Sequence, residues 1–564
     1  MNLIIYWCYI IIAFLMSFIP GFVIAGRFKS LSVLEKLSIS FGCSYVIIVM
    51  LVPFFAFKLN FIAQLIFIYI MIASLWYLLK KRLQLKFEID SRFIIMILII
   101  GLISKFFLQT LWEYPVMGGD WFWHTFRIPY AFEQGDWTPP TDRPPLFNLL
   151  IYSYHNLLGT SLYQYWISQI ISVVINSVYI FPAYLIAKKA FGDRVAKISA
   201  LFMLVTPFLI FNTLYTWPKN AAMYGILMMI YFLFFSEYDI KLRYPLAGFF
   251  AGLGFWFHNY AVFYIAIAVL LLIYKEKMYK GLISRNIFNN LKKLSYFLIV
   301  LLIVLAPYFL WVYSYYGTIS TSKFIYYPFA VKGYDSALSG DTQELFNTFY
   351  STPVKEIIMI RISNAIVTLT PAALPINPIA ASFSTYNPIF YYSHDYPGAL
   401  STLMYLVVVI LFFKYLLGKT KINLVLAGFV VLPIFIYLIL YGWREWGLLT
   451  GGLHPTIPLL IILGFNELYK SYNRLTGKIL VFLVFLVAII DNIIYFNIIK
   501  KFYYIEGGLR NVADSLHQVV PNADVSNLIS AYFLLNTEMD VILNLIITIS
   551  VSLFAYYLLM LRDV

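Results

Sequence analysis

The stretch PVMGGDWFWHTFRIPY, Pro115–Tyr130, gathers three side chains that can do chemistry. Asp120 follows two glycines, a natural position for a helix N-cap. If a helix begins at Trp121, then Asp120, His124 and Arg127 recur at helical spacing and lie on one face. The carboxylate, imidazole and guanidinium could then converge on one bound group. Alternatively, Asp120 only caps the helix, while His124 and Arg127 reach into lipid headgroups.

A second polar segment follows, TPPTDRPPLFNLL, Thr138–Leu150. Its proline pairs favour a stiff, extended conformation, and Pro145 suits the first turn of a helix. We interpret the segment as the rim of a substrate groove with Arg143 at its mouth. The alternative is a loop that leads into a surface helix.

Two short polar turns each carry one further candidate. Lys219 follows Trp217 and Pro218 in TWPKN, where a lysine could bind a phosphate or serve only as an interfacial anchor. His258 lies in FHNY between two apolar segments. It could contact a substrate or only stabilise the turn through hydrogen bonds.

The segment YGWREWGLLTGGLHP, Tyr441–Pro455, contains Arg444, Glu445 and His454. Its glycines and tryptophans suit a loop that binds a sugar, because aromatic faces stack on sugar rings. The alternative is an exposed Arg444–Glu445 ion pair that fixes the loop and contributes little stability.

The composition determines which elements must hold these side chains. Of the 564 residues, 62% are hydrophobic and 12% are charged, whereas soluble proteins are about half apolar and a quarter charged. We therefore predict an all-α polytopic membrane protein. The net charge of +14 does not indicate nucleic-acid binding, because lysine and arginine cluster in short gaps between apolar runs. Cys8 and Cys43 lie inside apolar runs, and we interpret them as small hydrophobic residues.

Apolar runs predict about 13–15 transmembrane helices. The candidate segments are Leu3–Ala25, Leu34–Phe57, Phe61–Leu79, Phe93–Leu108, Leu162–Ala187, Val195–Tyr215, Ala221–Phe235, Tyr244–Phe257, Ala261–Tyr274, Leu294–Tyr313, Ala399–Leu417, Ile422–Tyr441, Thr456–Tyr469, Ile479–Ile499 and Val541–Leu561. Tyr244–Phe257 and Ala261–Tyr274 are short, so they form either two thin helices or one re-entrant pair. Inside Ile479–Ile499, Asp491 lies beside Asn492, which favours a helix–helix hydrogen bond.

The basic residues occupy alternate gaps between these segments, so the positive-inside rule places the N-terminus outside and the C-terminus inside. The first run is too long for a signal peptide and lacks a basic start, so we interpret it as a retained helix. All of the candidate side chains lie in the opposite, outer gaps or at the outer ends of helices. This distribution predicts a site on the outer face of the plasma membrane.

An acidic residue in the first large outer loop, here Asp120, followed by a PPL segment that leads into a helix, resembles the GT-C class of membrane glycosyltransferases. This class includes protein O-mannosyltransferases and aminoarabinose transferases. TWPKN and GFWFHNYAVFY, Gly254–Tyr264, are similar to segments of prokaryotic members. The resemblance covers roughly Phe93–Tyr313. Family members usually place the acid after their first helix. Three further helices precede it here, and we interpret Leu3–Leu79 as an N-terminal addition.

The resemblance implies a polyprenyl-phosphate-linked sugar donor and a hydroxyl acceptor on a lipid, glycan or protein. Asp120 and His124 are then the catalytic candidates, with Asp120 as general base. Asp120 could also hold a divalent cation, but one acid and one histidine are too few ligands to assign a metal. Candidate substrate contacts are Arg127, Arg143, Lys219, His258, Arg444, Glu445 and His454, of which the cations would bind the phosphate. The sequence lacks the WWDYG signature of oligosaccharyltransferases, which argues against transfer of a complete oligosaccharide to asparagine.

We divide the chain into additional N-terminal helices (1–92), a catalytic core (93–314) with its first large outer loop at 109–161, an outer region (315–398), C-terminal helices (399–500), an outer segment (501–540) and a last helix (541–564). Two other functions remain open. A transporter or flippase of lipid-linked saccharide would place polar residues at the membrane midplane. A membrane assembly protein would need no site. The one-sided distribution of polar residues favours the enzyme.

Overall fold

The computed structural model describes residues 3–82, 89–111, 123–140, 143–214, 217–275, 287–319, 324–331, 342–369, 402–418, 423–440, 452–470, 475–505 and 546. Most of these residues are helical and none of them forms a strand, which confirms the all-α prediction. Every predicted apolar segment except Val541–Leu561 coincides with one or two helices. That last segment lies outside the described residues apart from Ile546.

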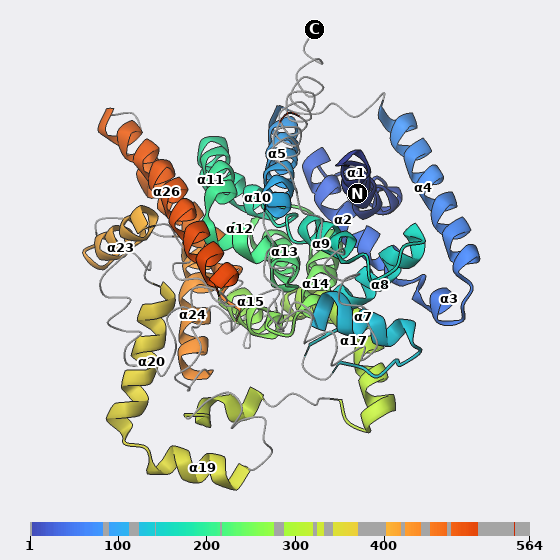
Figure 1. Ribbon diagram of the computed structural model, residues 1–564. Coiled ribbons are helices and arrows are strands. Elements are labelled where there is room, and N and C mark those ends of the chain that lie inside the picture. The colour runs from blue at the N-terminus through green and yellow to red at the C-terminus, as the bar shows by residue number, and fades with distance from the viewer. Residues whose placement is uncertain are drawn as a thin grey trace.

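The described helices pack together into one bundle (Figure 1). Their bounds are α1 Leu3–Ala25, α2 Val33–Val49, α3 Val52–Ala56, α4 Asn60–Arg82, α5 Ile89–Leu111, η1 Trp123–Arg127, α7 Ile128–Glu133, α8 Leu146–Leu158, α9 Tyr165–Ile175, α10 Ile180–Phe191, α11 Asp193–Val205, α12 Pro207–Leu214, α13 Lys219–Ile230, η2 Tyr231–Phe235, α14 Ile240–Phe257, α15 Ala261–Lys275, α17 Ile287–Tyr316, η3 Phe324–Phe329, α19 Thr342–Ser351, α20 Val354–Leu369, α23 Thr402–Leu416, α24 Leu424–Leu440, α25 Thr456–Lys470 and α26 Leu475–Ile505.

The described helices include several that can cross a membrane. By length and hydropathy, five qualify, or six if the bent pair α11 and α12 forms one span, and four further apolar helices are shorter. Large hydrophobic side chains on α1, α4 and α17 are exposed, as lipid-facing helices require. The chain is therefore a multi-pass membrane protein, with fewer full-length spans among its described residues than the sequence predicts.

Helix α13 and the π-helical turn η2 form the centre of the bundle (Figure 1). All residues of α13 are buried. Gly225 of α13 faces Gly254 of α14 so closely that a Cβ atom on Gly225 would lie 2.7 Å from the Gly254 Cα atom. Small residues let membrane helices approach in this way. Because α13 begins at Lys219 and α14 ends beside His258, this contact fixes the separation of two candidate side chains.

The N-terminal helices pack directly against this centre. Ser17 and Tyr154 hydroxyls are hydrogen-bonded at 2.5 Å, which joins α1 to α8. Tyr224 of α13 donates to the Ser38 carbonyl and accepts from the Gly42 N–H of α2. The segment interpreted as an N-terminal addition thus contributes to the same core as α13.

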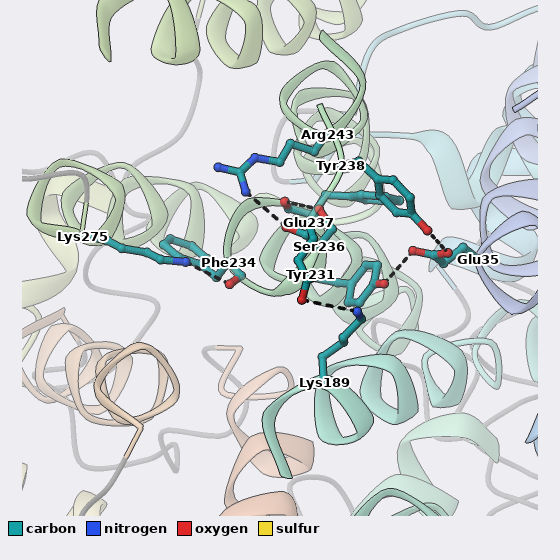
Figure 2. Close-up of polar contacts among 10 residues, drawn as sticks. Glu35, Lys189, Tyr231, Phe234, Ser236, Glu237, Tyr238, Arg243 and Lys275 are labelled. Atoms are coloured by element: carbon teal, nitrogen blue, oxygen red, sulfur yellow. Dashed lines mark hydrogen bonds and ion pairs between the residues drawn. The ribbon is translucent and has the colours of Figure 1, made fainter. Parts of the chain in front are cut away.

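Glu35 fixes α2 to the opposite end of the α13–η2 rod (Figure 2). Its carboxylate accepts hydrogen bonds from the hydroxyls of Tyr231 and Tyr238, each at 2.6 Å, and from Ser32, with which it forms a capping box. Arg243 and Lys275 donate to the carbonyls of Ser236 and Phe234 at the same end. Cations are favoured where a helix ends, so this side of the bundle is held by basic side chains.

Two of the buried helices are broken. Helices α9 and α10 are separated at Asn176, and α11 and α12 meet at an angle of 56° before Pro207. Asn492 of α26 donates to the Val205 carbonyl at this second break, at 2.7 Å. Asp491 accepts from the backbone N–H and the hydroxyl of Thr402 at the start of α23. The helix–helix hydrogen bonds predicted for this pair are confirmed.

Candidate active site

His124 and Arg143 meet although they come from different segments. Pro145 precedes the first residue of α8, and Asn148 lies one turn into that helix. An Arg143 Nη1 atom lies 2.9 Å from His124 Nε2, and the Asn148 amide lies against His124 Nδ1 and the His124 carbonyl. Because a guanidinium only donates, Nε2 of His124 accepts this hydrogen bond. His124 therefore holds and orients Arg143.

Lys219 is the first residue of α13, which starts there because Pro218 occupies the preceding position. Its side chain is only 1% exposed, and its Nζ atom lies 3.6 Å from the centroid of the Trp217 ring. The Arg143 guanidinium lies 5.4 Å from the same ring. Trp217 thus gathers both cations by cation–π attraction. The positive end of the α13 dipole adds to them, so the arrangement can bind an anion.

His258 and His454 lie on either side of Tyr260. The ring centroids of His258 and Tyr260 are 4.9 Å apart, and those of Tyr260 and His454 are 6.0 Å apart. The Tyr260 hydroxyl donates to the Lys219 carbonyl at 2.7 Å, which brings both histidines to the start of α13. Gly452 fits against Tyr260 at a φ of +113°, where a Cβ atom would meet the tyrosine ring at 2.4 Å.

The electrostatics of the site keep these imidazoles neutral. Burial lowers the pKa of His258 well below its usual range, and the nearby charges of Arg143, Lys219, His124 and His454 lower it further. Burial and Lys219 likewise lower the pKa of His454. Every neighbour that shifts these pKa values is a potential cation, so the site carries a positive potential without charging its histidines.

The structure brings together His124, Arg143, Lys219, His258 and His454 but does not add Arg127. Residues Trp123–Arg127 form a π-helical turn, whose bonding pattern differs from that of an α-helix. His124 is buried, whereas Arg127 is exposed. The α-helical face predicted for this pair is therefore wrong. Asp120, Arg444 and Glu445 lie outside the described residues.

The helix that follows Arg143 is buried in the core. Residues Leu146–His155 of α8 are all buried, with α7, α9 and α2 packed around them. The alternative interpretation, a loop that leads into a surface helix, is therefore wrong, because nearly every position of α8 faces another helix and not solvent. Arg143 is thereby held at the buried start of a core helix.

Several residues that build the site were missed by the sequence analysis. Tyr260 and Asn148 carry no charge, and their positions become meaningful only when α8 and α14 are packed. Lys105 had a visible signal, a lysine inside the apolar run Phe93–Leu108. It is buried and donates to the hydroxyls of Ser177 and Thr213 at 3.1 and 3.3 Å. Asn220, next to Lys219, donates to Thr213 as well.

The described residues do not fit a divalent cation. No group of three or more His, Cys, Asp or Glu side chains is placed to hold a metal among them. His124, His258 and His454 lie instead around Lys219 and Arg143, whose charges oppose a cation.

Residues 142–311 match the sequence profile of a family described as dolichyl-phosphate-mannose-protein mannosyltransferase. The match confirms the resemblance to membrane glycosyltransferases of the GT-C class. The matched residues fall within the predicted core, 93–314, and include Arg143, Lys219 and His258. No curated protein matches the chain.

Two solved structures are similar to this chain at 12% sequence identity. One is the crystal structure of ArnT from Cupriavidus metallidurans bound to undecaprenyl phosphate, with a TM-score of 0.46 over 80% of this chain and 87% of that chain. The other is ArnT from the same organism in the apo state, with a TM-score of 0.45 over 78% and 85% of the two chains.

Proposed function

We propose that this glycosyltransferase moves a hexose or pentose from a polyprenyl-phosphate-linked donor to a hydroxyl of a lipid, glycan or protein. The observation that carries the proposal is the placement of the buried Lys219 and the partly buried Arg143 beside Trp217 at the start of α13. A phosphate that joins a sugar to a lipid is an anion that must be bound away from bulk water. The family description, which names a dolichyl-phosphate sugar, supports the same class of donor.

In this proposal, Lys219 and the positive end of α13 bind the phosphate, and Arg143 grips a second oxygen. The orientation of Arg143 depends on His124, so His124 acts through the arginine. The acceptor hydroxyl oxygen attacks the anomeric carbon, and its proton passes to Asp120. The bond between the anomeric carbon and the phosphate oxygen breaks with its electron pair on the phosphate. The cations then stabilise the charge that develops on this leaving group.

We propose that the remaining candidates act outside the phosphate site. We propose that Arg127, which is exposed at the start of α7, meets lipid headgroups at the mouth of the site. Arg444 and Glu445 belong to the segment that ends at His454, and we propose that this segment contacts the sugar. The site would face outward at the plasma membrane, because basic residues hold the opposite end of α13.

The test is release of polyprenyl phosphate by the purified protein in detergent, supplied with polyprenyl-phosphate mannose or glucose and a mixed acceptor extract. We expect Asp120→Asn to abolish release and Lys219→Met to raise the KM for the donor at least about tenfold, since a charge-assisted bond is lost. Arg127→Met is the matched control and should keep the KM. Release that survives in Asp120→Asn would assign the base to another acid. Transport of the intact donor without release would favour the flippase.

A further inference from the structure

The two histidines beside Tyr260 leave hydrogen-bonding atoms of opposite kind unpaired, a donor in one ring and an acceptor in the other. In His258, Nδ1 lies 3.2 Å from the Tyr260 backbone nitrogen, which donates to it. A neutral imidazole with Nδ1 as acceptor carries its proton on Nε2. This Nε2 atom is buried and has no hydrogen-bond partner among the described residues. His258 therefore leaves one N–H donor unused.

His454 carries its proton on the same ring nitrogen, but the nitrogen that it leaves unpaired is the other one. Asn212 donates its amide nitrogen to the Phe208 carbonyl at 2.9 Å, so its amide oxygen faces His454. That oxygen lies 3.1 Å from Nε2 of His454. Nε2 must therefore carry the proton, and Nδ1 keeps a free lone pair. Nδ1 is buried and also lacks a partner in the described part of the chain.

A polar atom that is buried without a hydrogen-bond partner is unfavourable, so a ligand that satisfies both atoms gains affinity. The unused Nε2–H of His258 suits a phosphate oxygen, because the charges of Arg143 and Lys219 act on this ring. A fully ionised phosphate offers only acceptors, so it cannot satisfy Nδ1 of His454. That atom needs a donor, and a sugar bonded to the phosphate brings hydroxyl donors into the same place.

We propose that Nδ1 of His454 accepts a hydrogen bond from one hydroxyl of the transferred sugar, while Nε2 of His258 donates to the phosphate. The inference rests on the proposed function and names the part of the donor that each histidine recognises. His454 is then a specificity-determining residue. It stays fixed in its tautomer because Asn212 and Phe208 are on the same buried helix, α12. The low pKa of His454 keeps the lone pair available.

The test uses the full-length protein and monodeoxy analogues of whichever polyprenyl-phosphate sugar it accepts. We expect one analogue to lose at least about tenfold in kcat/KM with the wild type, because a site built to bind a hydroxyl rejects a substrate without it. In His454→Phe, which keeps the aromatic contacts to Tyr260 and Phe208, the parent and this analogue should react equally well. His258→Phe is the matched control. It should weaken inhibition by free polyprenyl phosphate and keep the discrimination between the two sugars.

The outcomes separate the two proposals. If the wild type releases no polyprenyl phosphate from any donor, the proposed function fails and the inference with it. If it does, and His454→Phe still rejects the same analogue, His454 does not read the hydroxyl and the inference alone is overturned. Should His454→Phe not fold, Asn212→Leu serves instead. It frees the imidazole to change tautomer, so it should reduce the same discrimination without removing the ring.

Discussion

At the scale of single residues, the histidines of the site have distinct tasks although they lie around the same cations. His124 is bonded through Nε2 to Arg143, whereas His258 and His454 each keep one buried ring nitrogen without a partner in the described structure. Their backbone and amide neighbours set these differences, through Tyr260 for one ring and Asn212 for the other. The hydrogen-bond partner of a histidine therefore sets its role, and the residue type alone does not.

Acid should destabilise the protein through His258 and His454. An unperturbed histidine has a pKa of about 6.5, and burial lowers the pKa of both residues in the folded state. Below about pH 6.5 the unfolded chain thus binds more protons than the folded chain, so stability present above this pH is lost as the pH falls. Apparent melting temperatures in detergent between pH 8 and 5 should show this decline. The double variant with His258→Gln and His454→Gln should show a smaller dependence of melting temperature on pH. An unchanged decline in the double variant would place its cause elsewhere.

The geometry of Arg143 should matter as well as its charge. Lysine at this position keeps the charge but lacks the planar fork of N–H donors. The fork lets arginine bond to His124 Nε2 and to a phosphate at the same time. We expect Arg143→Lys to raise the KM for the donor about tenfold, a loss of roughly 1.4 kcal/mol, with a smaller change in kcat. Steady-state kinetics with varied donor would measure it. An equal fall in kcat with unchanged KM would indicate that Arg143 acts only in the transition state.

At the scale of helices, the site depends on breaks and close approaches. Helix α13 begins at Lys219 immediately after Pro218, and the N–H of Ala221 is capped by Asn176 from the break between α9 and α10. Lys105 reaches the end of α12 through Thr213. Polar side chains inside the membrane thus satisfy the backbone groups that broken helices expose.

The α13–α14 contact gives a prediction at this scale. Gly225→Ala would place a Cβ atom against the backbone of Gly254, which cannot move aside as a side chain can. We expect a loss of about 1–3 kcal/mol of stability from overpacking, together with lower activity, because Lys219 and His258 would be forced apart. Melting temperature and donor KM would report both effects. Met228→Leu in the same helix is a volume-conserving change, so it should lower neither the stability nor the activity. A Gly225→Ala protein with wild-type values would show that the two helices can separate freely.

At the scale of the whole molecule, polar contacts hold one end of the bundle and the proposed site lies at the other. The rod of α13 and η2 connects them, with Lys219 at one end and the Glu35 cluster at the other (Figures 1 and 2). Glu35 belongs to α2, so the N-terminal helices are fastened to the element that carries the proposed phosphate site.

Removal of Glu35 should therefore loosen the whole bundle. Glu35→Ala leaves the Tyr231 and Tyr238 hydroxyls without their acceptor and breaks the capping box at Ser32. We expect a cost of about 3–5 kcal/mol, as for other broken buried networks. Glu237→Ala is the matched control, because its carboxylate is 85% exposed and pairs with Lys189 at 3.6 Å. An exposed pair is worth at most about 1 kcal/mol. Thermal melting of both variants compares them, and equal losses would contradict a special role for Glu35.

The sequence by itself determined the class of the molecule. Long apolar runs require helices, because only helices and closed barrels satisfy the backbone in lipid, and the predicted segments agree with the described helices. Lys219, Arg143, His124, His258 and His454 were identified as candidates because charged or polar side chains beside such runs are costly and rarely incidental. The family match over residues 142–311 includes the PPL segment and confirms the resemblance, whereas Asp120 precedes the matched residues.

Only the tertiary structure decided which candidates meet. Arg127 is separated from His124 by a π-helical turn, which the α-helical spacing of their positions did not indicate. Nothing local marks Asn212 or Tyr260, because they act through contacts between α12, α14, α15 and α25 that are distant in sequence. A hydrogen bond between remote helices depends on how the helices pack, and packing follows from the shapes of all buried side chains together. For this reason, the tautomers of His258 and His454 could not be predicted from their neighbours in the chain.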